Sequence, residues 1–196
     1  MRCLVSGCLP GIFNALCATT QHTLFFQPHQ QNGDGRRRDA RNTRSLADRG
    51  WFVIVKFGQN DILSYTVSFE NYTGGAHGSH AYNNHVINLK TGNAITEEDI
   101  FIENFQDSLA QILIDHIAKQ NKVENPKDLE NIGFFSVEEI FPNGNFLVDG
   151  DGITYTFNEY EIAAYVVRET NVFLPYAEIQ YLLKKDSPIY QLTMDN

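Results

Sequence analysis

The sequence predicts an α+β domain with a mainly antiparallel sheet, one long amphipathic helix at about residues 104–120, and a short C-terminal helix. Segments in which apolar and polar residues alternate lie on both sides of a single strongly helical stretch, and such alternation is typical of half-buried strands. Asn-Gly and Asp-Gly pairs between the later segments indicate hairpin connections. A parallel, doubly wound sheet would need a helical crossover between successive strands, and too few helices are predicted for that.

Three strands are predicted before the long helix. Residues 51–57 form a short apolar run, and residues 61–71 alternate, with Tyr65, Val67 and Phe69 on one face. Residues 85–90 alternate again and run into a turn at Lys90–Asn93.

The helical region begins at Thr96, where a hydroxyl and three following carboxylates are the pattern of a capped helix start rather than of a site. The long helix then shows one apolar stripe, made of Phe105, Leu109, Ile112, Leu113 and Ile117. His116 lies beside this stripe and is interpreted as a boundary histidine. Pro126 ends the long helix and is compatible with the first turn of a short second one.

The C-terminal third is predicted to return to strands, at residues 146–148, 153–157 and 171–174, before a helical segment at residues 176–183. Asp149 and Asp151 resemble the start of a calcium loop. The EF-hand pattern needs a further ligand at position five and a glutamate at position twelve, where Ile153 and Tyr160 stand. A hairpin turn is therefore the better interpretation.

Charge divides the chain of 196 residues at about position 50. The first 50 residues carry seven arginines against three acids and contain all three cysteines, whereas residues 51–196 carry seven lysines and one arginine against 21 acids. Residues 1–50 also lack apolar periodicity, so we predict an unstructured leader followed by a domain at residues 51–196. A basic binding tail and a start-site or reading-frame artefact are both open for this leader, and we favour the artefact.

Composition excludes several classes of function. The net charge of −9 argues against a nucleic-acid-binding protein, because phosphate binding needs a basic face. No run approaches the roughly 18 apolar residues of a membrane span. Residues 4–8 look like a bacterial lipoprotein processing box, but the apolar stretch of a working signal is too short, so the match is interpreted as accidental or as a relic of a truncated signal.

The heptapeptide at residues 72–78, Tyr-Thr-Gly-Gly-Ala-His-Gly, is the most informative stretch of the chain. Three glycines in five positions indicate positive φ angles or the close approach of another group around His77. A tight corner around a buried histidine, a ligand-holding loop and a catalytic loop are all compatible with this pattern.

The sequence gives little support for zinc binding or nucleophilic catalysis at this loop. His77, His80 and His85 are spaced closely enough for two imidazoles to share a zinc ion, but no cysteine and no H-E-x-x-H helix accompanies them. Thr73 and Ser79 flank His77, yet no nucleophile-elbow pattern is present. We therefore assign no catalytic residue, no metal site and no cofactor.

Two motifs resemble a known family. The heptapeptide followed by residues 88–92 and 99–101 is similar to the RsiV-like extracytoplasmic domain, and so is Phe-Asn-Glu-Tyr-Glu-Ile-Ala-Ala-Tyr at residues 157–165, followed by residues 172–176. The resemblance covers about residues 64–183. It implies an α+β domain of bacterial cell-envelope proteins that acts by binding more than by catalysis. In anti-sigma factors of this type the domain is an outward-facing sensor that binds lysozyme, and it also accompanies peptidoglycan-deacetylase domains.

Function is predicted from this resemblance. The chain is expected to be an N-terminally truncated member that binds or senses a protein or cell-wall ligand, such as lysozyme or a peptidoglycan-related component. The expected location is extracytoplasmic, with a lipid anchor in the full-length protein. The alternative is an envelope-polymer hydrolase or deacetylase-associated domain that uses His77. The residues expected to form the binding site are Tyr72, Thr73, Gly74, Gly75, His77, Gly78, Tyr160, Glu161 and Tyr165.

Overall fold

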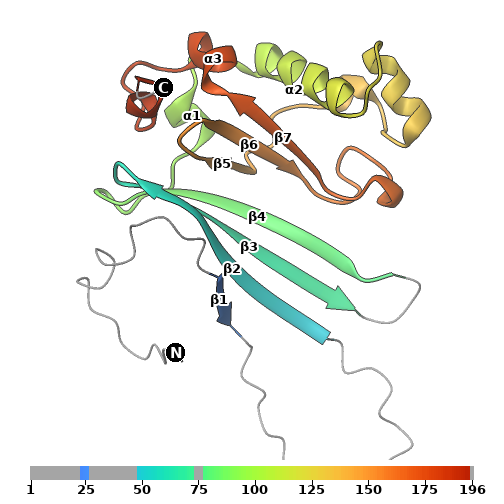
Figure 1. Ribbon diagram of the computed structural model, residues 1–196, viewed down its shortest axis with the longest axis horizontal. Coiled ribbons are helices and arrows are strands. Elements are labelled where there is room, and N and C mark those ends of the chain that lie inside the picture. Colours follow the sequence, from blue (N-terminus) through green and yellow to red (C-terminus); the bar gives the residue numbers. More distant parts are fainter. Residues whose placement is uncertain (1–22, 27–47, 73–76, 195–196) are drawn as a thin grey trace, which may run out of the picture.

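The computed structural model describes residues 23–26, 48–72 and 77–194, and it confirms the predicted α+β class with two antiparallel sheets (Figure 1). The first sheet has the order β1-β2-β3-β4, with strands β1 (Thr23–Phe26), β2 (Asp48–Gln59), β3 (Ile62–Tyr72) and β4 (Ser79–Asn88). The second has the order β5-β6-β7, with strands β5 (Phe146–Val148), β6 (Gly152–Phe157) and β7 (Thr170–Pro175).

The three α-helices lie within the segments that the sequence predicts as helical, whereas η3, η4 and η6 were not predicted. The α-helices are α1 (Glu97–Ile100), α2 (Gln106–Gln120) and α3 (Tyr176–Ile179). Short 3-10 helices are η2 (Pro126–Ile132), η3 (Val137–Glu139), η4 (Tyr165–Val167), η5 (Gln180–Leu182) and η6 (Tyr190–Met194). No helix among the described residues is long and apolar enough to cross a membrane.

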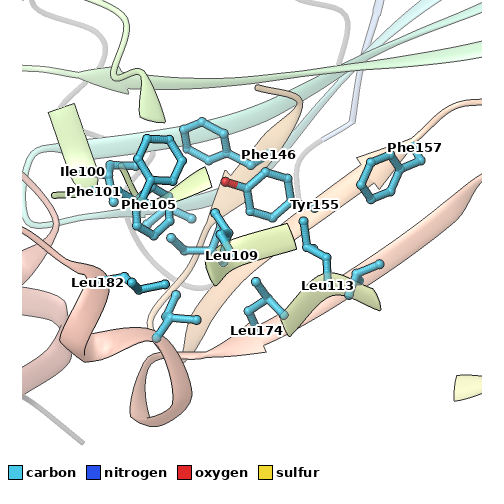
Figure 2. Packing of buried hydrophobic residues seen from close by; sticks show 14 of the residues in the cluster. Ile100, Phe101, Phe105, Leu109, Leu113, Phe146, Tyr155, Phe157, Leu174 and Leu182 are labelled. Atoms are coloured by element: carbon cyan, nitrogen blue, oxygen red, sulfur yellow. The ribbon is translucent and has the colours of Figure 1, made fainter. Parts of the chain in front are cut away.

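The second sheet lies between the first sheet and α2, which gives the molecule three layers (Figure 1). Its side toward α2 is apolar. Tyr155, Val172 and Leu174 are fully buried there, and Leu174 lies close to Leu113 of α2 (Figure 2). The predicted stripe of α2 therefore fills the core, and each such side chain contributes about 1.5–3 kcal/mol by leaving water.

The other side of the second sheet meets the first sheet through polar groups. Ser64, Thr66 and Ser68 form the buried face of β3, while Tyr65, Val67 and Phe69 share the opposite face and stay half-buried. The predicted alternation of β3 is confirmed, but the polar half of the pattern is the more deeply buried. Two of these hydroxyls have partners, since Ser64 bonds the second sheet and Thr66 bonds Asn84 of β4.

We call this interface the polar seam and define it by Ser64, Thr66, Asn84, Asn145, Thr156 and Asn158. Ser64 donates to the carbonyl of Val148 at 2.7 Å. Thr66 donates to the Asn84 side-chain oxygen at 2.8 Å, and the Asn84 amide donates to the Thr156 hydroxyl at 2.9 Å. Buried polar groups are tolerated when they are paired in this way.

The outward edge of β4 is also covered by the seam. Asn145 accepts from the Asn84 backbone N–H at 2.8 Å and donates to the Tyr82 carbonyl at 2.9 Å. Asn158 accepts from the Tyr82 backbone N–H at 2.7 Å. Two side-chain amides thus bond the main chain of β4 as a neighbouring strand would, which protects an edge strand.

The expected leader differs from the structure in two places. Strand β1 lies inside residues 1–50 and pairs antiparallel with β2, with Thr23 opposite Ile54 and Phe26 opposite Trp51. Strand β2 begins at Asp48, before the predicted domain boundary. The expectation of no regular structure is wrong for these segments, where short runs gain backbone partners that periodicity cannot reveal. Residues 1–22 and 27–47 lie outside the described residues, so the domain boundary stays a prediction.

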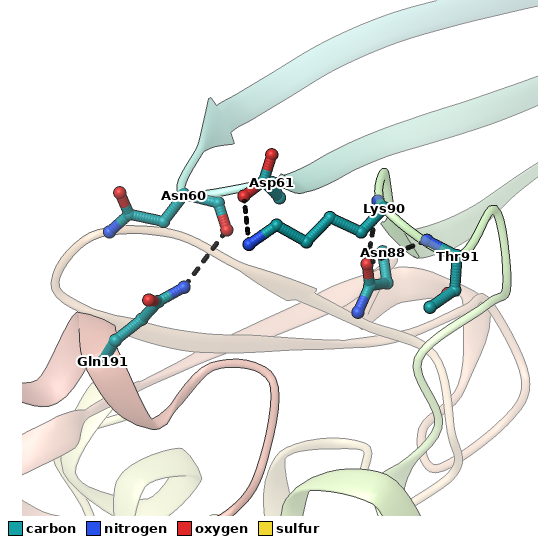
Figure 3. Close-up of polar contacts among 6 residues, drawn as sticks. All are labelled: Asn60, Asp61, Asn88, Lys90, Thr91 and Gln191. Carbon is teal, nitrogen blue, oxygen red and sulfur yellow. Dashed lines mark hydrogen bonds and ion pairs between the residues drawn. The ribbon is translucent and has the colours of Figure 1, made fainter.

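Turns and caps follow the predicted chemistry. Asp149 accepts from the backbone N–H groups of Asp151 and Gly152 at 2.9 Å each, so this segment is a hairpin turn. Thr96 and Asp99 form the capping box of α1. At the β2–β3 turn, Lys90 pairs with Asp61 at 2.9 Å and Gln191 donates to the carbonyl of Asn60 at 3.2 Å (Figure 3).

Candidate functional site

Three of the predicted site residues lie together at one end of the molecule. His77 precedes β4, Tyr160 follows β6, and Tyr165 begins η4. The ring centroids of His77 and Tyr165 are 4.6 Å apart with an interplanar angle of 30°, and those of Tyr160 and Tyr165 are 5.9 Å apart at 29°. We call these three rings the aromatic stack. It joins the two sequence motifs, which lie some 80 residues apart.

The stack is open to solvent. Tyr160 is 64% exposed and His77 is also exposed, while Tyr165 between them is half-buried. Exposed rings of this kind present a large apolar area at a small cost in conformational entropy, and they accept cations on their faces. The arrangement is suited to holding a partner's side chains.

The loop that carries Tyr160 is anchored on both sides of the ring. Asn158 bonds the Tyr82 main chain of β4, as described above. Glu161 accepts from the Asn158 backbone N–H at 2.8 Å and from the Asn143 amide at 2.6 Å. Glu161 therefore fixes the loop to the Asn143–Gly144 turn, which makes it a positioning residue of the loop.

Two residues in and just after the same loop have strained backbone conformations. Tyr160 has φ of 64° and Arg168 has φ of 65°, a left-handed region that residues other than glycine seldom adopt. Such conformations cost about 1–3 kcal/mol each and gather at functional sites. The anchors at Asn158 and Glu161 supply the hydrogen bonds that hold the strained loop in place.

The surroundings of the stack are acidic. Burial raises the pKa of the Tyr82 hydroxyl, and the nearby carboxylates Glu169, Glu70 and Glu159 raise that pKa further, whereas Arg168 lowers it. The field at this end of β4 is therefore dominated by negative charge. A positively charged partner fits such a field.

Among the other predicted site residues of the heptapeptide, the structure describes Tyr72 and Gly78. Tyr72 ends β3 and is 50% exposed, and its ring lies near Gly78. Gly78 has no positive φ, and an added Cβ would meet only ordinary contacts at 3.5–3.9 Å, so the structure does not require glycine there. Thr73, Gly74 and Gly75 lie outside the described residues.

The three histidines of the predicted zinc alternative go to different partners. His77 stacks on Tyr165, His85 stacks on Tyr65 with centroids 5.0 Å apart, and His80 lies 3.8 Å from Glu70. Within the described ranges, no group of three or more His, Cys, Asp or Glu side chains could hold a metal ion. His116 bonds Glu178 at 2.6 Å between α2 and α3, which fits its predicted boundary position.

Sequence reasoning missed the residues that assemble the site. Asn143, Asn145 and Asn158 position the loop and the edge of β4, and Arg168 and Glu169 shape its charge. The high density of asparagines at residues 143–158 was the available signal, because asparagine offers both a donor and an acceptor in one short side chain.

Comparisons with known proteins identify the sequence family that this region resembles. Residues 98–177 match the family described as protein of unknown function (DUF3298). That range contains the second motif and excludes the heptapeptide. A search of curated proteins gave no match.

Two solved structures have a similar fold. A crystal structure of a DUF3298 family member from Bacteroides fragilis NCTC 9343 has a TM-score of 0.70 at 28% identity, with 76% of this chain and 58% of that chain covered. A DUF3298 family protein from Pseudomonas aeruginosa PAO1 has a TM-score of 0.54 at 17% identity, with 71% of this chain and 65% of that chain covered. The present chain thus spans less than two thirds of either.

Proposed function

We propose that this protein is an extracytoplasmic binding or sensing domain of a bacterial cell-envelope protein, and that the aromatic stack is its binding surface. The contact of His77 with Tyr165 carries the proposal, because it unites the two RsiV-like motifs in one exposed patch. The expected ligand is lysozyme or a peptidoglycan-related component. The extracytoplasmic location, and a lipid anchor in the full-length protein, rest on the resemblance of the motifs.

Charge supports a basic protein as the partner. Residues 51–196 carry seven lysines and one arginine against 21 acids, and Glu159 and Glu169, which act on Tyr82 of β4, lie within four residues of Tyr160 and Tyr165 in the sequence. Lysozyme is strongly basic, so long-range attraction would speed its encounter with this face. Arginine or lysine side chains of the partner would then lie against the exposed face of Tyr160.

The geometry favours binding over catalysis by His77. The imidazole lies face to face with the Tyr165 ring. In the described part of the chain, no serine, threonine or cysteine side chain is hydrogen-bonded to His77, as an activated nucleophile would be. A hydrolase that uses His77 as general base therefore has less support.

Retention of the full chain on immobilised lysozyme and on insoluble peptidoglycan tests the proposal. The full chain is used because β1 pairs with β2. Tyr160→Ala should reduce retention about tenfold, the loss expected for removal of a central aromatic contact. Tyr181→Ala is the matched control, since Tyr181 on η5 is 66% exposed but lies outside the stack.

The outcomes separate the possibilities. Loss of retention for Tyr160→Ala with an unchanged midpoint of thermal unfolding supports the aromatic stack as the binding surface. Equal retention of the two variants assigns binding to another face. No retention of the wild-type chain on either material at low salt removes lysozyme and peptidoglycan as ligands.

A further inference from the structure

Exposed apolar side chains gather around the turn that carries Tyr165. Val166 in η4 is 81% exposed, and Ile132 at the end of η2 and Phe135 shortly after it are exposed as well. We call Ile132, Phe135 and Val166 the apolar patch. Single exposed apolar residues need no explanation, but several that lie together mark an interaction surface.

Main-chain contacts join the segment after η2 to the segment before η4. An antiparallel bridge pairs Phe134 with Ala163, and the Phe135 N–H donates to the carbonyl of Ile162 at 2.9 Å. Phe134 and Ala163 are both buried. Because successive side chains of a bridged segment point to opposite sides, the ring of Phe135 is turned outward.

Gly133 lets η4 pack directly on the end of η2. The Ala164 N–H donates to the Gly133 carbonyl at 2.8 Å, and Gly133 has φ of 108°. A Cβ at Gly133 would lie 3.1 Å from a methyl carbon of Val167 and 3.6 Å from one of Val166. Val166 therefore lies against the residue that follows Ile132, and the patch is one surface.

The turn that exposes Val166 is held in a strained conformation. The Arg168 N–H donates to the carbonyl of Tyr165 at 3.0 Å, which closes the η4 turn around Val166. Arg168 itself has φ of 65° and ψ of −161°, a combination that is essentially confined to glycine. Such strain gathers at binding and catalytic sites, so it favours a binding role for the residue that this turn displays.

Negative charge lies on the η2 and η3 side of the patch. These two helices contain one cation, Lys127, which lies 3.8 Å from Glu138. The Glu130 carboxylate accepts from the Val137 N–H at 3.3 Å, which ties η2 to η3. The exposed carboxylates of the two helices are Asp128, Glu130, Glu138 and Glu139. The patch is therefore an apolar surface with an acidic border, which complements apolar side chains that have cations beside them.

We propose that the apolar patch binds a segment of a partner protein in which apolar side chains are flanked by lysine or arginine. The apolar side chains cover Val166 and Phe135, and the cations face the carboxylates of η2 and η3. A second copy of this chain fits less well, because a symmetric contact would bring the same carboxylates together. The proposal rests on the proposed function and deepens it, since η4 carries both Tyr165 of the aromatic stack and Val166.

Fluorescence anisotropy of the full chain with two labelled peptides tests the proposal. One peptide carries leucines on one face of a helix and lysines on the other, and the second has the same composition in scrambled order. The patterned peptide should bind at least about tenfold more tightly. Val166→Ser and Phe135→Ser should each weaken its binding at least about fivefold, since each removes a central apolar contact.

Matched variants at distant positions are the controls. Leu89→Ser removes an exposed apolar side chain after the end of β4 that is opposite His77, and it should leave the affinity unchanged. Glu139→Gln should weaken binding about twofold at low salt and less at high salt. Glu103→Gln removes the same charge before the start of α2, far from η2, and should have no effect. An unchanged midpoint of thermal unfolding shows that each variant is folded.

Several results would overturn the proposal. These are equal affinity for the two peptides, equal losses for Leu89→Ser and Val166→Ser, and self-association of the wild-type chain that Val166→Ser abolishes, measured by sedimentation. If the wild type is retained on lysozyme or peptidoglycan but does not distinguish the peptides, the apolar patch fails while the proposed function stands. Preference for the patterned peptide without retention on either material supports the patch and removes those two ligands.

Discussion

The two faces of the second sheet are built on different chemistry. Its face toward α2 is closed by side chains such as Leu113, Val172 and Leu174, which are fully buried and carry no polar atoms. Its face toward the first sheet is closed by the polar seam, in which Asn84 and Thr156 are also buried but are joined by hydrogen bonds. Apolar packing tolerates small shifts, whereas a buried amide requires its partner in one position. The seam therefore fixes the relative placement of the two sheets, and the core supplies most of the stability.

Among the variants that test this difference, a truncation in the apolar core should lower the free energy of unfolding the most. Leu113→Ala removes a fully buried side chain between α2 and the second sheet, and the free energy of unfolding should fall by about 2–5 kcal/mol. Urea denaturation measures the loss. Ile132→Ala is the control at a 45% exposed position and should change stability by less than about 0.5 kcal/mol. Similar losses at the two sites would contradict the assignment of the core.

Breaking the seam should cost less, but it should reveal coupling between the sheets. Asn84→Ala removes the acceptor of the Thr66 hydroxyl and the donor to the Thr156 hydroxyl, which still donates to Asn171, so stability should fall by about 1–3 kcal/mol. Thr156→Val in the same background should add less than it costs in the wild type, because the hydrogen bond from Asn84 is already lost. A double-mutant cycle by urea denaturation measures the coupling, and strict additivity would show that the network is not cooperative.

Glu97 adds a titratable group to the comparison, because its carboxylate interacts with the hydroxyl of the buried Tyr155. Its pKa in the folded chain is raised by burial above the ordinary value of 4.5, so the charged form is disfavoured by folding. The wild type should therefore gain stability as the pH falls from neutrality through the raised pKa toward 4.5. Glu97→Gln lacks this titration, so any advantage of the variant should be largest at neutral pH. An unfolding midpoint difference that is constant between neutral and acidic pH would contradict the raised pKa.

The smallest effect is expected at the far end of the first sheet. Lys90 and Asp61 form an ion pair of 2.9 Å, but their side chains are 73% and 48% exposed (Figure 3). Lys90→Met should therefore change the free energy of unfolding by less than about 1 kcal/mol, and the change should vanish at high salt. A larger loss that persists at high salt would mean that this end of the sheet is held more tightly than its exposure indicates.

The same contrast explains what the sequence could predict. The core could be predicted because Leu109, Leu113 and Ile117 repeat with the period of a helix, and residues 153–157 repeat with the period of a sheet. The polar seam could not be predicted from the sequence. Ser64, Thr66 and Asn84 are polar residues typical of an exposed face, and Ser64 and Asn84 are buried against partners far along the chain. Strand β1 was missed for a similar reason, as four residues carry too little pattern.

The sequence predicted several residues of the candidate site but not the contacts that those residues make. The motifs named His77, Tyr160 and Tyr165, which the structure brings into contact. They did not show that Glu161 would bond Asn143 and Asn158 and so anchor the loop. That choice depends on the backbone of the loop, whose positive φ at Tyr160 no residue pattern signals.

The covering of β4 by asparagine side chains has a consequence for how the chain folds. The main-chain groups of Tyr82 and Asn84 are bonded by residues that follow them by 61–76 positions. During synthesis, β4 therefore exists before the amides that cover it, and its edge is bare until the second sheet forms. Contacts between such distant segments are slow to form, and a bare edge is a template for pairing with another chain. We therefore expect the nascent protein to be open to pairing at this edge until Asn145 and Asn158 reach β4.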